Sequence, residues 1–309
     1  MIVTENLTKF YGKLKALDDL TINVKKGVTG FLGPNAAGKT TTIKILMGML
    51  KPTKGRALVL GIDPTKKPIE VKKKVGFLPE NPKPYRGMSG FEFLNFIAKL
   101  RGLRDRRERE RQVSELLQKV GLYDRAKDKI STYSRGMIQR LAIAQALIGD
   151  PQLILLDEPT AGLDPLGREE VISLITELKK SGKSLFISSH ILSEIERVCE
   201  RVLIIDRGQL VLDGNVEEIK SQFSSGRYKV KVDKPDLLLK ELSQKHFVKE
   251  TWLEEGYVLV LPTDESEFRK SVLEISIMLG CEVFSLEKER PSLQEVFVSL
   301  IRKRGGEIK

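Results

Sequence analysis

The 309-residue sequence is poor in cysteine and histidine, and it has no long apolar run. Cys199 and Cys281 are the only cysteines and lack the spacing of a metal site, so a reducing cytoplasm is the simplest setting. No apolar stretch approaches the roughly 20 residues that a membrane span requires. The first 12 residues, MIVTENLTKFYG, lack the apolar centre of a secretory signal. With 40% hydrophobic and 31% charged residues, the composition predicts a soluble globular protein, and the length predicts two domains.

An excess of positive charge is confined to one part of the chain. Residues 221–309 contain 15 Lys and Arg and 15 Asp and Glu, so residues 1–220 carry the whole net charge of +11. Such an excess suits nucleotide phosphates, nucleic acid or an anionic membrane surface as partners. The densest run, RGLRDRRERER at 101–111, mixes both signs and is typical of a solvated helix face.

Apolar periodicity divides the first two thirds of the chain into strands and helices. Short apolar runs predict strands in residues 1–30, 55–61 and 73–79. Ser89 and Glu92 have the pattern of a capping box, after which helical signals continue to about Ile148. The segments QLILLDEP and SLFISS are typical of buried strands, Asp164-Pro165 of a helix start, and RVLIIDRGQLVLDG of a hairpin. This alternation predicts a parallel, doubly wound sheet with a helical block inserted at about 82–150.

The pattern changes after Gln222. The segment SSGRY is typical of a linker or a first turn, and the following runs have the order β-α-β-β-α-β of a ferredoxin-like domain. A last helix begins at a second capping-box pattern, Ser292 with Glu295. We therefore expect a first domain over 1–222 and a C-terminal accessory domain over 223–309.

The stretch FLGPNAAGKTTTIK at 31–44 places a glycine-rich turn between an apolar strand and a helix. Gly33, Gly38, Lys39 and Thr40 have the spacing G-x-x-x-x-G-K-[ST] of a phosphate loop. Such a loop points backbone N–H groups at an anion, and the helix N-terminus adds its positive dipole. We expect Lys39 to reach the outer phosphates of a nucleoside triphosphate and Thr40 to bind Mg²⁺. The residues expected to contact the nucleotide are Gly33, Pro34, Asn35, Ala36, Ala37, Gly38, Lys39, Thr40 and Thr41.

Two carboxylates and a histidine follow other predicted strands. Asp157 ends the apolar run LILLD, where open α/β sheets bind ligands, and it suits the Mg²⁺ shell. Glu158 is next to it and can polarise the attacking water as a general base. His190 follows SLFISS, at the same edge as Asp157 if the sheet is parallel, and can donate a hydrogen bond to the γ-phosphate. The other histidine, His246, has no such setting.

The segment TYSRGMIQRLAIAQAL places Ser134 and Gly136 just before a strong helix. Small residues there leave backbone N–H groups open to an anion. The residues alone leave helix capping and phosphate binding as equal alternatives at this position.

Together these motifs resemble the nucleotide-binding domain of an ABC ATPase, in family order across residues 1 to about 220. GPNAAGKT is similar to the Walker A motif, LILLDEP to Walker B, YSRGM to the signature motif and AGLD at 161–164 to the D-loop. The resemblance implies that Tyr11 stacks on adenine, that His190 is the switch histidine and that Asp164 lies at the nucleotide. The implied fold is α/β: a P-loop NTPase core with an antiparallel β subdomain and an inserted helical subdomain, plus the C-terminal ferredoxin-like α+β domain.

Three residues depart from the family pattern. Arg135 and Ala36 stand where glycine is commonest in the signature motif and the phosphate loop. The backbone donors of the loop survive the second change if φ at Ala36 is negative. Glu80 stands at the Q-loop glutamine; it can still bind the metal but adds a negative charge.

The C-terminal segment PSLQEVFVSL at 291–300 resembles the ending of ATPase subunits of drug, antibiotic and multidrug exporters. The resemblance implies an ATPase using ATP and Mg²⁺ that powers export through a separate membrane permease, at the inner face of the membrane. It also implies a head-to-tail dimer, either a homodimer or a heterodimer with a paralogue, in which Ser134 and Gly136 of one chain meet the ATP of the other. The C-terminal domain is expected to stabilise the dimer or regulate it.

One alternative is a soluble ABC ATPase that acts on the ribosome or on nucleic acid. Such proteins usually have two fused ATPase domains or a long coiled-coil insertion, and this sequence shows neither, so no nucleic acid is expected. A GTPase or small-molecule kinase fits the phosphate loop alone, but the sequence has no N-K-x-D guanine motif.

Overall fold

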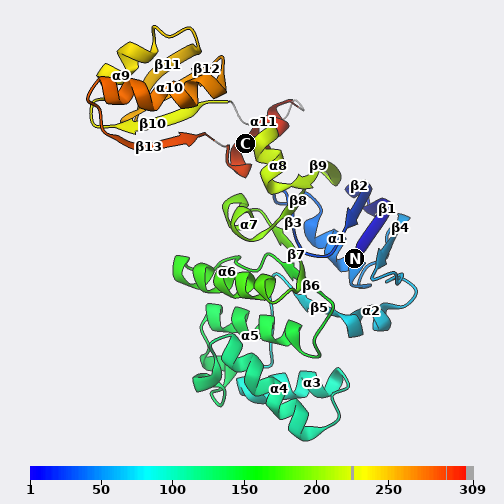
Figure 1. Cartoon of the computed structure of the whole chain (residues 1–309). Helices are drawn as coiled ribbons and strands as arrows, with labels where there is room; N and C mark the ends of the chain where they lie inside the picture. Colours follow the sequence, from blue (N-terminus) through cyan, green and yellow to red (C-terminus); the bar gives the residue numbers. More distant parts are fainter. Residues whose placement is uncertain (224–225, 290, 304–309) are drawn as a thin grey trace. The chain divides into compact units, whose positions relative to one another are not determined.

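The computed structural model describes residues 1–223, 226–289 and 291–303, and the chain forms two compact units, Met1–Val216 and Glu217–Lys309 (Figure 1). The sequence places the domain boundary after Gln222, which is the last residue of helix α8 (Val216–Gln222). The two compact units divide at the start of this helix, between Val216 and Glu217. Residues 224 and 225 of the expected linker lie outside the described residues, as does the end of the accessory domain, 304–309.

A six-stranded sheet forms the centre of the first unit, in the order β5-β6-β7-β3-β8-β9. All pairs of adjacent strands in this sheet are parallel, except the antiparallel hairpin of β8 and β9. Strands β3, β6 and β7 are buried at every residue. Burial on both faces explains why these strands read as apolar runs in the sequence. The strands are β3 (Val28–Leu32), β5 (Val75–Leu78), β6 (Leu153–Asp157), β7 (Ser184–Ser189), β8 (Arg201–Asp206) and β9 (Gln209–Asn215).

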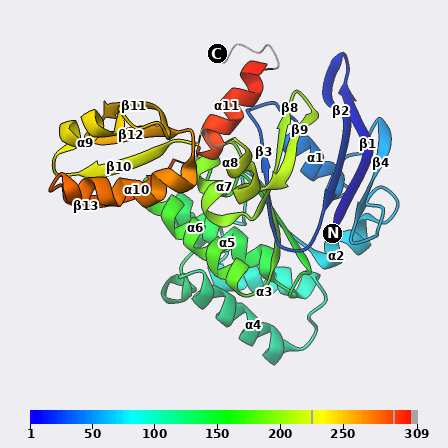
Figure 2. The ribbon, with the colours of Figure 1, turned by 45° about the horizontal axis from the view of Figure 1, so that its top comes forward.

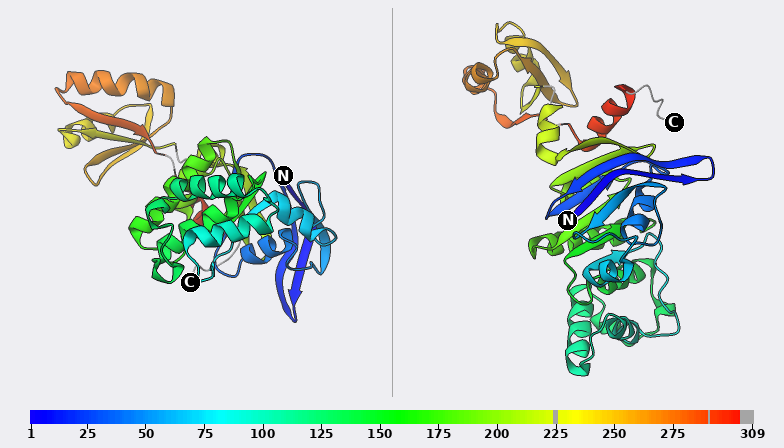
Figure 3. Two further views of the ribbon diagram at one scale, coloured as in Figure 1. Left: turned by 90° about the horizontal axis from the view of Figure 1, so that it is seen from below. Right: turned by 90° about the vertical axis from the view of Figure 1, so that its right-hand side faces the viewer.

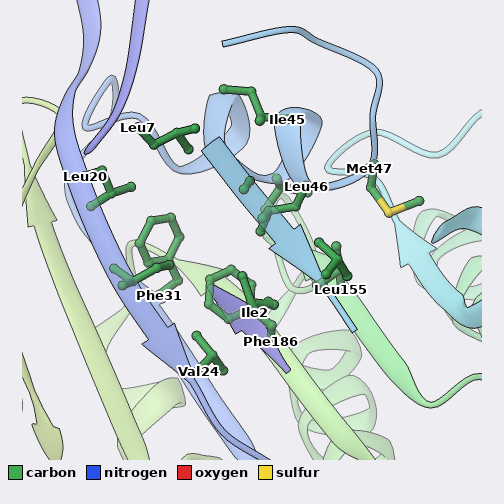
Figure 4. Close-up of a cluster of buried hydrophobic side chains, with 14 of the residues drawn as sticks. Ile2, Leu7, Leu20, Val24, Phe31, Ile45, Leu46, Met47, Leu155 and Phe186 are labelled. Atoms are coloured by element: carbon green, nitrogen blue, oxygen red, sulfur yellow. The ribbon is translucent and has the colours of Figure 1, made fainter. Parts of the chain in front are cut away.

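A second, antiparallel sheet has the order β2-β1-β4, from β1 (Ile2–Tyr11), β2 (Leu14–Val24) and β4 (Lys54–Val59). Its strands run beside the central sheet of the same unit (Figure 2). A buried cluster joins the two sheets, with Ile2 and Leu20 from one and Phe31 and Phe186 from the other (Figure 4). The Phe31 and Phe186 ring centroids are 5.1 Å apart. This core fixes the end of β3 from which the glycine-rich loop departs.

Helices α3 (Gly90–Leu100), α4 (Arg106–Lys119) and α5 (Arg135–Leu147) form the helical block, with short 3₁₀ turns at Tyr123–Arg125 and Ile130–Thr132. Helix α5 packs on β5 and α6 (Pro165–Lys180) as well as on α3 and α4. The helical block, coloured cyan to green, lies at one end of the first unit (Figure 3, right). The capping box of Ser89 and Glu92 is present, which confirms that prediction. The remaining helices of this unit are α1 (Lys39–Leu46), α2 (Pro68–Lys74) and α7 (Leu192–Val198).

The second unit has an antiparallel sheet in the order β11-β12-β10-β13, with α9 and α10 between strands in the ferredoxin-like β-α-β-β-α-β sequence. Its own core includes Tyr228, Val260 and Phe268. The capping box of Ser292 and Glu295 is present at the start of α11. The elements are β10 (Tyr228–Val232), α9 (Pro235–Leu242), β11 (Val248–Glu254), β12 (Tyr257–Pro262), α10 (Glu265–Met278), β13 (Val283–Lys288) and α11 (Leu293–Lys303).

None of the helices within the described ranges combines the length and the apolar character that a bilayer-spanning helix needs.

Candidate nucleotide-binding site

The parallel strands β3, β6 and β7 end at one edge of the central sheet, and the candidate residues follow these ends. The register pairs Leu32 with Ser189 and Asp157 with Ser188. The glycine-rich loop 33–38 leaves β3, Asp157 ends β6 with Glu158 directly after it, and His190 follows β7. Open α/β sheets bind ligands at such an edge.

Two glycines of the loop occupy positions with no room for a side chain. A Cβ on Gly33 would lie 2.5 Å from the carbonyl oxygen of Ile205, and one on Gly38 would lie 2.7 Å from that of Ala16. Gly38 also has a φ of 105° as the residue preceding α1. The loop is therefore packed tightly against β8 and β2, and its path requires glycine at both positions.

Ala36 adopts a left-handed conformation, with a φ of 64°. The condition of a negative φ, on which the survival of the loop's backbone donors was made to depend, is therefore not met at this residue. The left-handed region costs an L-residue about 1–2 kcal/mol relative to the right-handed helical region. Ala36 thus holds a conformation that glycine adopts more readily, and the loop stores some strain there.

Replacing Ala36 with Gly is expected to raise the free energy of unfolding by up to about 1 kcal/mol and to leave ATP affinity unchanged. The relief of the left-handed conformation is partly offset by the greater freedom of glycine in the unfolded chain. Urea unfolding measures the effect. Ala37→Gly is the matched control, because Ala37 is buried and is not among the residues with positive φ, so its substitution should destabilise the protein. A lower urea midpoint for Ala36→Gly than for the wild type would contradict the argument.

Lys39, Glu158 and His190 form a connected group at the sheet edge. The Lys39 Nζ lies 3.2 Å from Oε1 of Glu158 and donates to the carbonyl oxygens of Gly33 (2.6 Å) and Pro34 (3.1 Å). Nδ1 of His190 lies 2.8 Å from Oε2 of Glu158. The Lys39 and Glu158 side chains are only 6% and 7% exposed, whereas that of His190 is 43% exposed. A buried carboxylate is thus held between a cation and an imidazole.

Asp157 lies beside this group and carries its own hydrogen bonds. Its Oδ1 accepts from the hydroxyls of Ser188 (2.6 Å) and Thr40 (3.4 Å). Burial raises the pKa of the Asp157 carboxyl, and the nearby charges of Glu80 and Glu158 raise it further, while the two hydroxyls act in the opposite direction. The carboxyl groups of Asp157, Glu80 and Glu158 thus lie close together beside the Thr40 hydroxyl. A cation bound among these oxygens would offset the repulsion between their negative charges.

A cavity of about 490 Å³ opens at this edge. It brings together loop residues Asn35–Thr41 with Tyr11, Glu80, Glu158 and His190, all of which the sequence singled out. Tyr11 is 46% exposed at the end of β1, so its ring is accessible to a ligand. Leu14, Lys15, Ala16 and Ala161 complete the lining.

Gly33, Pro34 and Asp157 were also predicted at the site but are not among the residues that line this cavity. The remaining predicted residues lie at two helix starts, which do not line it either. Ser134 caps α5, its hydroxyl accepting from the N–H of Met137 at 3.2 Å, and Gly136 lies in the first turn. Asp164 caps α6, with Oδ1 accepting from Gly167 at 2.9 Å, as the Asp-Pro pair predicts. Within one chain, therefore, helix capping is the visible role of Ser134 and Asp164.

Sequence reasoning missed Ser188 and Gln139. The Ser188 hydroxyl donates to Asp157, and the same oxygen accepts from the N–H of Glu158 at 3.0 Å. Gln139 is buried and donates to the carbonyl oxygen of Pro159 at 2.7 Å. A polar residue inside a buried strand or on the buried side of a helix is the signal that could have identified both, because buried polar groups need partners.

The protein has a glycine-rich loop between the buried strand β3 and a helix, a buried lysine, and two carboxylates at the end of β6, which β7 separates from β3. Together these features define the class of P-loop nucleoside triphosphatases. A family model described as ABC transporter matches residues 17–161. A second, described as ATP-binding protein DrrA1-3-like, C-terminal domain, matches residues 214–301.

Relatives match along the whole chain. An uncharacterised ABC transporter ATP-binding protein of Nostoc sp. is 38% identical, over 98% of this chain and 90% of its own length. The daunorubicin resistance ATP-binding protein of Streptomyces coeruleorubidus is 33% identical, over 97% of this chain and 95% of its own. The bacitracin transport ATP-binding protein of Bacillus licheniformis is 42% identical, over 72% of each chain. The chain belongs to the ABC transporter ATP-binding proteins, which are ATPases that drive transport.

Solved structures agree with this assignment. An ATP-binding subunit of an ABC transporter has a TM-score of 0.65 and 30% identity, covering 72% of this chain and 93% of that one. A dimeric ATP-binding cassette in a post-hydrolysis state, bound to ADP and Pi, has a TM-score of 0.62 and 27% identity, covering 70% and 98%. These matches confirm the P-loop NTPase fold and ATP binding, and they do not favour the ribosome or nucleic-acid alternative.

Proposed function

We propose that this chain is the ATP-hydrolysing subunit of an exporter, with the hydrolytic machinery at the edge of β3, β6 and β7. The observation that supports this proposal best is the connected group of Lys39, Glu158 and His190 beside the glycine-rich loop. Asp157 lies next to this group and accepts from Thr40. Tyr11 stacks on the adenine, and the backbone N–H groups of residues 35–41, at the end of the loop and the start of α1, surround the phosphates.

Glu158 is the general base that polarises the attacking water. Its carboxylate is held from two sides, by Lys39 at 3.2 Å and by His190 at 2.8 Å. Lys39 contacts the outer phosphates. The Nδ1 of His190 is engaged by Glu158, which leaves the other ring nitrogen for the γ-phosphate.

The donor set at Asp157 fits Mg²⁺, which prefers carboxylate and hydroxyl oxygens and usually keeps only one or two protein carboxylates. Thr40 and Asp157 supply such oxygens next to each other, and Glu80 adds a second carboxylate close enough to influence Asp157. When bound, Mg²⁺ would neutralise charge on the β- and γ-phosphates.

Removing Mg²⁺ is expected to reduce ATP hydrolysis to the uncatalysed background, and restoring it is expected to recover full turnover. Phosphate release in the presence of excess chelator measures this, with chelator presaturated by Mg²⁺ as the control. Hydrolysis that continues at its original rate in the chelator would contradict the proposed role of Thr40 and Asp157.

Two copies bind head to tail and enclose two ATP molecules, each between the loop of one chain and Ser134 and Gly136 of the other. The N-terminus of α5 suits this role because its first N–H groups point out of the helix end. A homodimer is the simplest assembly, and a heterodimer with a paralogue is the alternative that a measurement of solution mass distinguishes. The dimeric state of a related ATP-binding cassette supports the arrangement.

The partner in the membrane is a separate permease subunit, and the chain lies at the cytoplasmic face through that contact. Relatives named for bacitracin transport and for daunorubicin resistance support export of a drug or antibiotic. Stable attachment of the purified chain to vesicles lacking a permease would contradict this location. No nucleic acid is proposed as a partner; RNA or DNA binding that weakens steeply with salt would favour the soluble alternative.

The C-terminal unit stabilises or regulates the dimer. Its independent core and ferredoxin-like sheet suit an accessory domain, and the same region matches a separate family model. Unchanged dimerisation and transport after removal of this unit would contradict the proposal.

A further inference from the structure

A set of contacts joins α5 to the loop 159–164, in which Ala161 also lines the cavity. The Arg135 guanidinium donates through Nη2 to the carbonyl oxygen of Ala161 at 3.2 Å. Gln139, one helical turn further along, donates to the carbonyl oxygen of Pro159 at 2.7 Å. Two side chains of one helix thus hold alternate carbonyls of one short loop.

Gly162 makes the Arg135 contact possible. A Cβ at Gly162 would lie 2.1 to 2.4 Å from three guanidinium atoms of Arg135, so the side chain occupies the space that a larger residue would fill. Gly162 also has a φ of 66°. The position of the Arg135 side chain therefore depends on glycine at 162.

The loop 159–164 begins directly after Glu158. Glu158 itself has a left-handed φ of 49°, and its N–H is held by the hydroxyl and carbonyl oxygens of Ser188. Thr160 donates to the carboxylate of Glu194 at 2.5 Å. A non-glycine residue keeps a strained backbone only where its surroundings hold it. The direction of the Glu158 side chain therefore depends on the hydrogen bonds of Ser188 to Glu158 and on those that hold the loop 159–164. Arg135 is the exposed member of the set, whereas Gln139 and Glu194 are buried.

We propose that Arg135 is a positioning residue for hydrolysis: its contact with Ala161 ties the start of α5 to the loop that orients Glu158. The inference rests on the proposed role of Glu158 as the base. The start of α5 is also the segment that the proposed dimer places against the partner's ATP. Arg135 therefore connects the segment that contacts the partner's ATP with the position of Glu158, the general base for the ATP bound to its own chain.

The first test compares Arg135→Gly with Arg106→Gly. Arg106 is the first residue of α4 after the cap Asp105, as Arg135 is the first residue of α5 after Ser134. Among the residues that the structure describes, however, the Arg106 guanidinium pairs with Glu110 on its own helix and with no other side chain. Both changes place glycine at the same position of a helix, so the loss of helix propensity is matched. Arg135→Gly is expected to lower kcat about five- to tenfold, within the net worth of one ordinary hydrogen bond because this contact is exposed, with KM for ATP unchanged. Arg106→Gly should keep wild-type kcat.

Arg135→Lys retains a charged donor and should keep kcat within about twofold of the wild type. A kcat for Arg135→Gly equal to that of Arg106→Gly, or no recovery in Arg135→Lys, would overturn the proposal. A change in KM without a change in kcat would also overturn it, because that result assigns Arg135 to nucleotide binding.

A double-mutant cycle with Gly162→Ala provides the second test. The added methyl group displaces the Arg135 side chain and also strains the backbone, whereas in the Arg135→Gly background only the strain remains. Gly162→Ala should therefore lower kcat about five- to tenfold more in the wild type than in Arg135→Gly. Equal factors in the two backgrounds would show that the residues act independently and would overturn the proposal. Glu158→Gln, measured alongside, separates this failure from failure of the proposed base.

Discussion

Glu158→Gln abolishes nearly all ATP turnover and leaves ATP binding intact; this is the largest effect expected of any single substitution in the chain. The amide cannot accept a proton from the attacking water, and loss of a general base typically costs about 10²- to 10⁴-fold in rate. Asp157, Thr40 and the glycine-rich loop are unchanged in this variant, so the phosphate and metal contacts remain. Steady-state phosphate release and equilibrium ATP binding measure the two quantities separately.

The same variant reports on assembly. Because the proposed dimer is held together by ATP, Glu158→Gln should shift from monomer to dimer in solution mass only when Mg-ATP is added. A monomeric mass with ATP demonstrably bound would point to a different partner chain and contradict the homodimer. Glu169→Gln is the matched control, since Glu169 is exposed and pairs with Arg197 on the surface, and this change should alter neither turnover nor mass. Near-wild-type turnover in Glu158→Gln would assign the base to another group.

Lys39→Ala weakens ATP binding by roughly 30- to 1,000-fold, an effect of about 2–4 kcal/mol. The Lys39 ammonium is almost fully buried and is the cation closest to the glycine-rich loop in the contacts described, with Nζ 2.6 Å from the Gly33 carbonyl oxygen. Its removal takes away a charge-assisted contact with the outer phosphates and leaves the Glu158 carboxylate without its neighbouring cation.

Calorimetric titration with ATP measures the affinity of this variant, and a thermal melt establishes that it is folded. Lys44→Ala is the control, because Lys44 lies on the same helix α1 and is exposed. Unaltered ATP affinity in Lys39→Ala would remove the lysine from the phosphate site. A loss of equal size in Lys44→Ala would show that the effect arises from net charge rather than from position.

The sequence predicted those elements whose signals are local and strong. Apolar runs marked β6 and β7, and the two capping boxes marked the starts of α3 and α11. The order of motifs along the chain predicted which strand ends meet, because parallel strands bring their carboxyl ends to one edge.

Features that depend on distant residues were not predictable in this way. Helix α2 buries only Val71, so its apolar periodicity is too weak to distinguish it from a loop. The left-handed φ of Ala36 comes from the packing of the whole loop rather than from the preference of alanine. The contact of Arg135 with Ala161 joins residues 26 positions apart, and nothing in the residues around Arg135 indicates its partner.

The complete burial of β3, β6 and β7 has a consequence for how the site can move. Backbone amides in strands without exposed residues exchange with solvent mainly when the whole domain unfolds, so these strands belong to its most slowly exchanging part. The glycine-rich loop, Glu158 and His190 directly follow these strands, so they are attached to a part of the sheet that does not unfold locally. Any adjustment that admits a nucleotide or releases a product must then come from the segments beyond the strand ends, while the spacing between the strands themselves stays constant through the working cycle.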